Sequence, residues 1–452
     1  MFRLGFISAN NFKEPYPVYP LGASYLITYL EKHMPECRCS LFDFNLDGEY
    51  DELRAWCEEG AFDAIAISLR NIDDNNILSE NCFVNHYIRI VQTLRRVTDV
   101  KILVGGAGFS IFPELLLDRL GVDFGIKGEG ERSLCELLDA IFHGKDWHSI
   151  EGLVYRDGDG KVRVNGRRSF VESPCLRMNP GSVKYYFDKS GMLNVQTKRG
   201  CPFSCIYCSY PIIDGKRVRN LDSGTVLDNI VEMNRDYGID YLFFTDSVFN
   251  IDRSYNEELC HRILESGVKV RWGAYFSPRN LTRDDLALYQ QAGLTHIEWG
   301  TDTLADRTLE TYGKGITWDE IRRTSLWAGE LGIFYAHFMI LGGYGETDDT
   351  LRQTFERSKE LGFTVFFPYV GMRIYPGTKL YDIALQEGVV SGAEELIEPK
   401  YYVSKDVSLD NVRELAAATG QKWIFPGDGN EALIERFRAK KRRGPLWEYL
   451  RY

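Results

Sequence analysis

Segments typical of β-strands alternate with helical patterns along most of this 452-residue chain, and this alternation limits the fold more than any other feature. Between residues 193 and 390, several helical patterns end in glycine, which is a C-cap signal. Strands joined by helices pair in parallel through right-handed crossovers. We therefore predict a parallel α/β sheet with strands at 193–197, 241–245, 270–275, 296–300, 334–341 and 364–370 and helices at 225–237, 255–266, 282–292, 319–332 and 347–362.

A second α/β pattern occupies residues 1–145. Its spacing predicts a doubly wound, Rossmann-like sheet whose ligand crevice lies at the carboxyl ends of the strands. Glycine or polar residues follow three of these strands, at 68–71, 105–108 and 127–131. The predicted strands are 3–9, 40–44, 64–69, 101–105 and 123–126, and the predicted helices are 21–33, 49–58, 85–97, 113–120 and 131–143.

Two further segments complete the predicted organisation. Residues 146–192 are predicted to link the two α/β units and to contain a β-hairpin at 152–164 with a glycine turn. Residues 391–452 form a mainly polar C-terminal segment that contains Trp423, Trp447 and Tyr449. Two interpretations stay open for this segment, closure over a substrate and packing as a helix.

Cys201, Cys205 and Cys208 form a Cys-x3-Cys-x2-Cys run on one predicted loop. Three thiolates at this spacing can hold three corners of a cubic [4Fe–4S] cluster and leave the fourth iron open for a substrate or cofactor. A zinc site would need a second Cys or His pair, and none follows at a suitable spacing. The other cysteines are scattered, with none after Cys260, so the sequence predicts neither a second cluster nor a disulfide framework.

This loop, from Lys198 to Cys208 with the aromatic Tyr207 before the third cysteine, resembles the signature of radical S-adenosylmethionine (SAM) enzymes. The resemblance implies a partial barrel of six strands with the active site at the strand carboxyl ends. It also implies that the open iron chelates SAM and that an electron from the cluster cleaves SAM to a 5′-deoxyadenosyl radical. The resemblance names no catalytic residue.

The same resemblance assigns SAM contacts to the strand ends. Asp246 and Ser247 replace the Gly-Gly-Glu-like segment that holds the SAM amino group, and Asp302 and Thr303 replace the Glu-Ser pair that contacts the ribose. Local roles fit some of these residues equally well: Asp246 also fits a local ion pair, and Glu346-Thr347 also fits a helix cap. The full implied SAM set is Tyr207, Asp246, Ser247, Asp302, Thr303, Gly342 and Gly343 beside the adenine, and Arg373 before a Pro-Gly-Thr turn.

Residues 1–145 resemble the cobalamin-binding domain that is fused to radical SAM domains, and with the barrel the resemblance covers about residues 1–390. It rests on Pro20-Leu21-Gly22, on Gly105-Gly106 and on the Gly-Glu-Gly-Glu run at 128–131. The alternative is a degenerate sheet that has lost its cofactor and only supports the barrel. The implied cobalamin contacts are Ser68, Arg70, Asn71, Gly105, Gly106, Gly128 and Glu129.

One departure from other cobalamin proteins concerns the cobalt. The Asp-x-His-x-x-Gly motif that provides a lower histidine ligand is absent, and the loop after the third predicted strand carries Arg70 instead. A guanidinium stays protonated and cannot coordinate a metal. We therefore expect cobalt without a protein ligand from this loop, with Arg70 or its neighbours blocking the lower face.

Composition excludes some classes of function. A net charge of −11 argues against a broad nucleic-acid surface, and we interpret the basic stretch 436–443 as a solvated helix end. No run of about 18 apolar residues predicts a transmembrane helix, and the first residues lack the features of a signal peptide, so we expect a cytoplasmic protein.

Together these features predict a cobalamin-dependent radical SAM enzyme of the methyltransferase-like class B. The predicted reaction methylates an unactivated carbon, or a phosphinate, of a small molecule, lipid or natural-product intermediate. The implied cofactors are a [4Fe–4S] cluster, SAM and cobalamin, with an electron donor such as flavodoxin or ferredoxin. The alternatives are a radical rearrangement or cyclisation without methyl transfer, and a non-catalytic cobalamin or cluster sensor.

Overall fold

The computed structural model describes residues 1–79, 81–167, 169–172, 174–429 and 431–451. The chain divides into two compact units, and each contains one seven-stranded sheet. The first unit comprises Met1–Asp74, Asn81–Tyr185 and Ile212–Gly215, and the rest of the described chain forms the second unit. Within these described ranges, no helix is both long enough and apolar enough to cross a lipid bilayer.

The first unit has the predicted doubly wound sheet, with strand order β2-β1-β3-β4-β5-β6-β7. The first five strands in sequence are parallel. Strand β2 lies on one side of β1, and β3, β4 and β5 follow on the other side, so the strand order reverses between β1 and β3. This position is a topological switch point. Its strands are β1 (Phe2–Ser8), β2 (Cys37–Asp43), β3 (Ala64–Ser68), β4 (Lys101–Gly105), β5 (Phe124–Ile126), β6 (Leu153–Arg156) and β7 (Val162–Val164). Its helices are α1 (Leu21–His33), α2 (Tyr50–Gly60), α3 (Val84–Arg95), α4 (Ala107–Ile111), α5 (Pro113–Leu120) and α6 (Glu131–His143).

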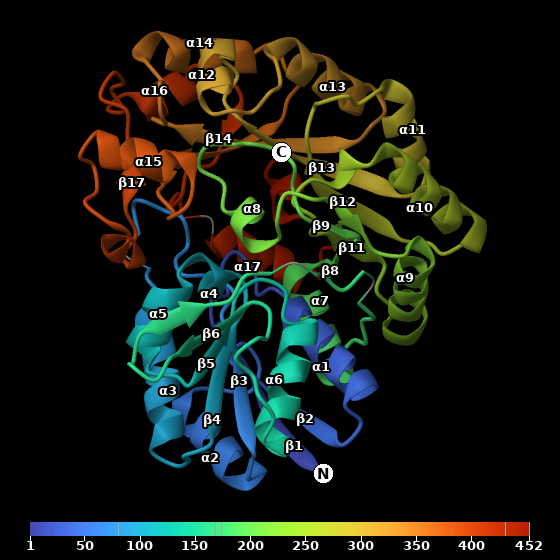
Figure 1. The fold of residues 1–452 in the computed structure, drawn as a ribbon. Coiled ribbons are helices and arrows are strands. Elements are labelled where there is room, and N and C mark those ends of the chain that lie inside the picture. Colours follow the sequence, from blue (N-terminus) through green and yellow to red (C-terminus); the bar gives the residue numbers. More distant parts are fainter. Residues whose placement is uncertain (80, 168, 173, 430, 452) are drawn as a thin grey trace. The chain divides into compact units, whose positions relative to one another are not determined.

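Helices cover both faces of this sheet. Helices α1 and α6 contact each other on one face, and α2, α3 and α5 lie on the other (Figure 1). The central strands are therefore apolar along their whole length, as Ala64–Ile67 and Ile102–Val104 show.

The predicted hairpin exists, but it is part of the first sheet. Strand β6 pairs antiparallel with β5, and β7 pairs antiparallel with β6. The edge of β5 offers unpaired backbone groups, and the hairpin satisfies them. The first compact unit consequently reaches Tyr185, beyond the boundary expected at residue 145.

The second unit has a curved, all-parallel sheet with strand order β18-β15-β14-β13-β12-β11-β8. The six predicted strands are present, and helices α9, α10, α11 and α13 lie along the outer side of the sheet (Figure 1). The strands are β8 (Leu193–Val195), β11 (Tyr241–Phe244), β12 (Arg271–Phe276), β13 (Leu294–Asp302), β14 (Phe334–Leu341), β15 (Val365–Val370) and β18 (Lys422–Trp423).

Shorter elements complete the described chain, and most helices of the second unit have the predicted positions. The helices are α7 (Pro180–Ser190), α8 (Tyr210–Ile213), α9 (Ser223–Tyr237), α10 (Arg253–Ser266), α11 (Arg283–Gln291), α12 (Asp306–Thr311), α13 (Trp318–Glu330), α14 (Asp348–Ser358), α15 (Lys379–Gln386), α16 (Val412–Ala417) and α17 (Glu431–Ala439). Two small ribbons pair β9 (Lys198–Arg199) with β10 (Arg219–Asn220) and β16 (Met372–Arg373) with β17 (Tyr401–Tyr402). Three 3-10 turns are η1 (Phe249–Ile251), η2 (Ala393–Ile397) and η3 (Leu446–Arg451).

Both tryptophans of the C-terminal segment pack in the core of the second unit. Trp423 on β18 stacks on Phe366, with 4.3 Å between ring centres, and Trp447 is buried with Ala336 and Val365. Burying such large apolar side chains stabilises the sheet, which favours the packing interpretation for these two residues.

Candidate functional site

The cysteine loop follows β9 in the second unit and is anchored at its centre. The Ile206 amide donates to the Tyr312 carbonyl at 3.0 Å, and the Ile206 carbonyl accepts from the Leu380 amide at 2.8 Å. Within the loop, the Cys208 amide donates to the Cys205 carbonyl at 3.2 Å. These bonds fix a turn that carries all three cysteines, so the loop is held from two neighbouring segments before any metal binds.

The Cys201 side chain is buried, those of Cys205 and Cys208 are half-buried, and the thiols influence one another. Burial raises the pKa of Cys205, and it raises the pKa of Cys208 to about 12, with smaller contributions from the neighbouring cysteines. In the described part of the chain, no three His, Cys, Asp or Glu side chains gather closely enough to share one metal ion. A cubic cluster does not require this, because each thiolate binds a different iron. The donor set and its spacing therefore fit a [4Fe–4S] cluster.

A buried ion pair lies at the base of this loop. Lys198 Nζ lies 3.0 Å from Asp246 Oδ2, and neither side chain is exposed to solvent. The ammonium also donates to Thr197 Oγ1 at 2.7 Å and to Asn256 Oδ1 at 3.1 Å, and it lies 4.5 Å from the centre of the Phe249 ring. Burial lowers the pKa of Lys198, and Asp246 opposes that effect.

Asp246 has a different role from the one its position suggests. Its Oδ1 accepts from the backbone amides of Thr197 at 2.8 Å and Lys198 at 3.0 Å, while Oδ2 accepts from the Thr197 hydroxyl and the Lys198 ammonium. Both oxygens of this carboxylate are engaged inside the protein, which favours the local ion pair over the expected contact with the SAM amino group. Asp246 instead fixes the strand that leads into the cysteine loop.

Ser247, the neighbour of Asp246, supports the same loop from its surface. The Ser247 hydroxyl donates to the Gly200 carbonyl at 3.2 Å, and Gly200 directly precedes Cys201. This half-buried hydroxyl therefore lies beside the start of the cysteine loop, and its predicted contact with SAM stays a prediction.

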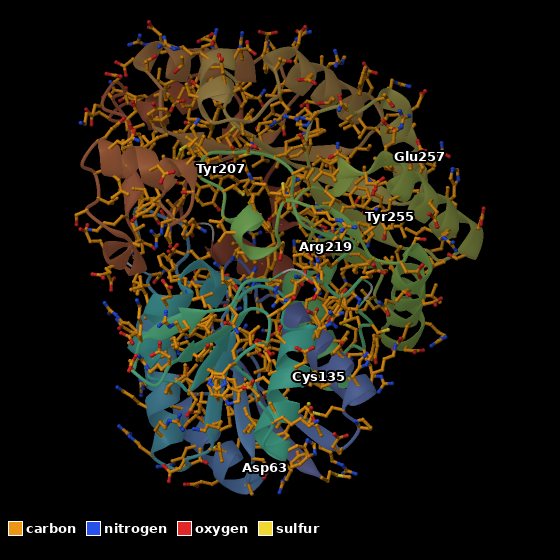
Figure 2. The ribbon with its side chains drawn as sticks, in the orientation of Figure 1. Asp63, Cys135, Tyr207, Arg219, Tyr255 and Glu257 are labelled. Carbon is orange, nitrogen blue, oxygen red and sulfur yellow. The ribbon has the colours of Figure 1, made fainter. Side chains whose placement is uncertain are left out.

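Tyr207 and Asp302 are brought together from the cysteine loop and from the end of β13. The Tyr207 hydroxyl donates to Asp302 Oδ2, and Figure 2 shows Tyr207 on the inner side of the second unit, far from the outer residue Glu257. The β-ladder shifts register between Trp299 and Asp302, and Asp302 has a φ of 66°. Bulges and left-handed residues re-aim side chains and are common near functional sites, so this geometry supports Asp302 as a site residue.

Lys314 completes this cluster, and the sequence analysis missed it. Its ammonium lies 2.7 Å from Asp302 Oδ2 and 3.4 Å from the Tyr207 hydroxyl. Burial lowers the pKa of Lys314, but the charges of Asp302 and Cys205 outweigh burial, so the pKa is raised overall. The available signal was a lysine between two glycines, Gly313 and Gly315, which both have positive φ.

The loop that carries Lys314 packs on the cysteine loop. A Cβ on Gly313 would lie 2.7 Å from the Ser204 carbonyl oxygen, and Arg279 lies over the Phe203 ring while donating to the Lys314 carbonyl at 3.0 Å. This close approach explains why Gly313 must be glycine, and it sets Lys314 beside the cluster site.

Three other predicted SAM residues make contacts within the protein. Thr303 is buried with its hydroxyl 3.0 Å from that of Thr354. Arg373 is buried on β16 and donates to the carbonyls of Ile374 at 2.8 Å and Leu396 at 2.7 Å. A Cβ on Gly343 would lie 2.3 Å from the Tyr312 hydroxyl, so this glycine allows the tyrosine to pack closely against it.

Gly342 adjoins a buried acid, Glu346, for which a helix cap was the alternative role. The Gly342 amide donates to Glu346 Oε2, and burial raises the pKa of Glu346 to about 8. Thr347 is the residue that caps α14, since its hydroxyl accepts from the Thr350 amide. The C-terminal segment contacts this turn, because the Ser404 amide donates to the Gly342 carbonyl at 2.7 Å.

In the first unit, the three predicted strand-end loops adjoin one another. The Gly108 amide donates to the Leu69 carbonyl at 2.9 Å, and the Gly128 amide donates to the Ser110 hydroxyl at 2.8 Å. A Cβ on Gly106, whose φ is 97°, would lie 2.5 Å from the Leu69 carbonyl oxygen. Gly106 thus allows the β3 and β4 loops to pack closely, and its contact with cobalamin stays a prediction.

The remaining predicted cobalamin residues surround these loops. Arg70 is exposed, Ser68, Asn71 and Gly105 are half-buried, and Glu129 is buried. The Asn71 carbonyl accepts from the Tyr87 hydroxyl at 2.5 Å, which fixes the loop after β3. The exposed Arg70 guanidinium therefore lies beside a loop whose backbone is held by the Tyr87 hydroxyl.

One histidine of the first unit lies near the carboxyl end of β1. His86 Nε2 donates to the Ala9 carbonyl at 2.9 Å, and its Nδ1 accepts from the Tyr50 hydroxyl at 2.6 Å. Burial lowers the pKa of His86. With both ring nitrogens bonded, this imidazole has no lone pair to offer to cobalt.

Comparisons with known proteins agree with both halves of the site. The model of the radical SAM superfamily matches residues 195–358, and the model of the B12 binding domain matches residues 8–138. An uncharacterized methyltransferase of Pyrococcus horikoshii is 26% identical over 413 residues, which cover 86% of this chain and 85% of the relative. Tryptophan 2-C-methyltransferase of Streptomyces laurentii is 25% identical over 445 residues, covering 83% of this chain and 74% of the relative.

The fold also matches a solved structure. The radical SAM methyltransferase TsrM from Kitasatospora setae, solved with a tryptophan substrate and a SAM analogue bound, aligns with a TM-score of 0.90 at 22% identity. The alignment covers 100% of this chain and 97% of TsrM.

A cysteine loop of the radical SAM type on one chain with a B12 binding domain defines the class of cobalamin-dependent radical SAM enzymes. The chain belongs to the methyltransferase family of this class, and its cofactors are a [4Fe–4S] cluster, SAM and cobalamin. The predictions of family, fold class and cofactors are confirmed.

Proposed function

We propose that this enzyme transfers a methyl group from SAM to an unactivated carbon, or a phosphinate, of a small molecule, lipid or natural-product intermediate. The observation that carries the proposal is the Cys201–Cys208 loop in a radical SAM domain on one chain with a B12 binding domain. Two relatives that align with more than four fifths of this chain are named methyltransferases, one of them tryptophan 2-C-methyltransferase, and this favours methyl transfer over rearrangement.

The cysteine loop and its neighbours are proposed to bind and orient SAM. The cluster, when bound, supplies the electron that cleaves SAM, and the electron comes from a donor such as flavodoxin or ferredoxin. Asp302 Oδ2 is occupied by Tyr207 and Lys314, and among the described residues no hydrogen bond reaches Oδ1. We propose that Oδ1 accepts from a ribose hydroxyl and that Lys314 meets the SAM carboxylate.

The three loops of the first unit are proposed to hold cobalamin, which supplies the methyl-carrying cobalt when bound. The proposed contacts with cobalamin come from the backbone and polar side chains of five residues, Ser68, Asn71, Gly105, Gly128 and Glu129. Arg70 is proposed to face the lower side of the ring, where a guanidinium excludes a ligand without coordinating cobalt.

Products of SAM test this function. Anaerobically reconstituted protein should hold one cubic cluster per chain and one cobalamin, and with reductant and a substrate it should form S-adenosylhomocysteine together with 5′-deoxyadenosine. The matched control is the Cys201→Ala/Cys205→Ala/Cys208→Ala variant, which should lose the cluster while retaining cobalamin. Formation of 5′-deoxyadenosine alone would instead support rearrangement, and no SAM cleavage at all would support a sensor.

A further inference from the structure

The inner face of the second sheet is only partly covered by the protein. Side chains alternate between the two faces of a strand. On the outer face Trp272 and Trp299 are fully buried, and the Trp272 indole donates to the Ala292 carbonyl at the end of α11. On the inner face, by contrast, Tyr275, Phe338 and Phe367 are each only half-buried. Three large aromatic side chains on the inner face are thus not fully covered by other parts of the protein.

These inner residues form a continuous aromatic wall. Tyr275 and Phe338 have ring centres 6.1 Å apart with planes at 75°, and Phe338 stacks on Phe367 at 5.1 Å. Gly300 lies beside them on β13, and a Cβ placed on it would meet no atom within 4 Å. The missing side chain therefore leaves open space on the strand between β12, which carries Tyr275, and β14, which carries Phe338.

One carboxyl group lies at the base of this wall. Glu298 is two residues before Gly300 on β13, with Tyr275 and Ala336 as its partners in the β-ladder. Its Oε1 accepts from the Trp447 indole at 3.2 Å, and the Tyr275 hydroxyl provides a second hydrogen bond. Burial raises the pKa of Glu298 from 4.5 to about 7.

Glu298 lacks a cationic partner. Across the described ranges, no Lys, Arg or His side chain forms an ion pair with it, in contrast to the paired Asp246 and Asp302. A buried carboxyl without a cation is costly in its charged form, and a ligand that brings an N–H or ammonium group would relieve that cost. A purely structural acceptor for Trp447 would not need to be ionisable.

We propose that this inner face is the substrate-binding surface and that it selects a flat, largely apolar ring compound whose N–H or ammonium group binds Glu298. The inference rests on the proposed function for the location of substrate, and it adds the chemical class. The rings of Tyr275, Phe338 and Phe367 stack on the flat body, the space beside Gly300 admits it, and Glu298 fixes its nitrogen.

A matched pair of probes tests the surface on the reconstituted holoenzyme. 1-Naphthylmethylamine and 1-naphthaleneacetate share a ring system but carry opposite charges. Equilibrium dialysis should show binding of the amine and much weaker binding of the acid. Glu298→Gln retains a hydrogen-bond acceptor for Trp447 but removes the charge, and it should weaken amine binding roughly ten- to a hundredfold.

Two variants separate recognition from folding. Gly300→Val should fill the open space and reduce binding of the amine, whereas the exposed Glu310→Gln should leave it unchanged. Iron content and far-UV circular dichroism should match the wild type in Glu298→Gln, Gly300→Val and Glu310→Gln. Equal binding of the two probes, absence of binding, or full amine affinity in Glu298→Gln or Gly300→Val would overturn the inference.

The two hypotheses fail in different ways. Transfer of a labelled methyl group from SAM to cobalamin can be measured without any substrate or probe. If that transfer fails while the amine binds through Glu298, the proposed function is wrong and the nitrogen-selective surface stands. If transfer succeeds and Glu298→Gln binds the amine normally, only the surface assignment is wrong.

Discussion

Replacing Asp246 with asparagine should destabilise the second unit rather than remove a ligand for SAM. Lys198 and Asp246 have no solvent exposure, and four donors converge on the carboxylate. Asparagine would leave the Lys198 charge uncompensated and would turn an amide NH2 toward two of these donors. Breaking a buried pair in this way costs about 3–5 kcal/mol.

Anaerobic urea unfolding, followed by circular dichroism, measures this cost. The matched control is Asp240→Asn, because Asp240 pairs with Arg271 at 3.1 Å while both side chains are about half exposed. An exposed pair contributes about 0–1 kcal/mol, so the control should unfold close to the wild type. Lys198→Met combined with Asp246→Asn should be less destabilised than the sum of the single variants, since the double variant buries no unpaired charge.

SAM affinity decides between the two roles of Asp246. Our account predicts that any folded Asp246→Asn protein with a full cluster binds SAM with nearly wild-type affinity. An Asp246→Asn protein that unfolds like Asp240→Asn but binds SAM at least tenfold more weakly would refute the account. It would restore Asp246 as a direct contact to the SAM amino group.

Three further predictions concern the SAM site, pH and cobalt. Asp302→Ala should weaken SAM binding roughly ten- to a hundredfold in calorimetry while iron content is unchanged, and unchanged affinity would refute the ribose assignment. Because the pKa of Glu298 is raised from 4.5 to about 7, the folded state binds the proton more tightly, so this group's contribution to stability is full below pH 4.5 and is lost as pH rises to about 7. The difference in unfolding free energy between wild type and Glu298→Gln should therefore change by up to about 3 kcal/mol across this window, and a flat difference would contradict the shift. Bound cob(II)alamin should show no nitrogen hyperfine splitting from a protein imidazole in electron paramagnetic resonance, and its appearance would contradict the assignment of Arg70 to the lower face.

The features that could be predicted from the sequence are mostly local in the chain. The three cysteines lie within one loop, so the ligands of the cluster could be predicted directly from the sequence. Strand and helix alternation depends on short-range apolar patterns, and both parallel sheets followed from it. The hairpin at 152–164 was also readable, but its pairing with β5 was not, because an open sheet edge has no sequence signature.

The sequence was least informative where tertiary packing decides the role of a polar residue. Asp246 stands where a SAM contact was expected, yet Lys198 arrives from a segment 48 residues earlier and engages it. Lys314 reaches Asp302 only because the loop after α12 folds onto the cysteine loop. Gly106 and Gly343 were expected to lie beside cofactors, and in the structure the atoms that approach them belong to Leu69 and Tyr312.

Methyl transfer to cobalamin in the absence of substrate tests the central claim most directly. The reconstituted protein, reduced anaerobically, would be mixed with SAM that carries a deuterated methyl group, and the cobalamin would be extracted in the dark for mass spectrometry. The account predicts a cobalamin carrying the deuterated methyl group and a matching amount of S-adenosylhomocysteine. Cobalamin that is bound and reduced but stays unlabelled, with no S-adenosylhomocysteine formed, would contradict it.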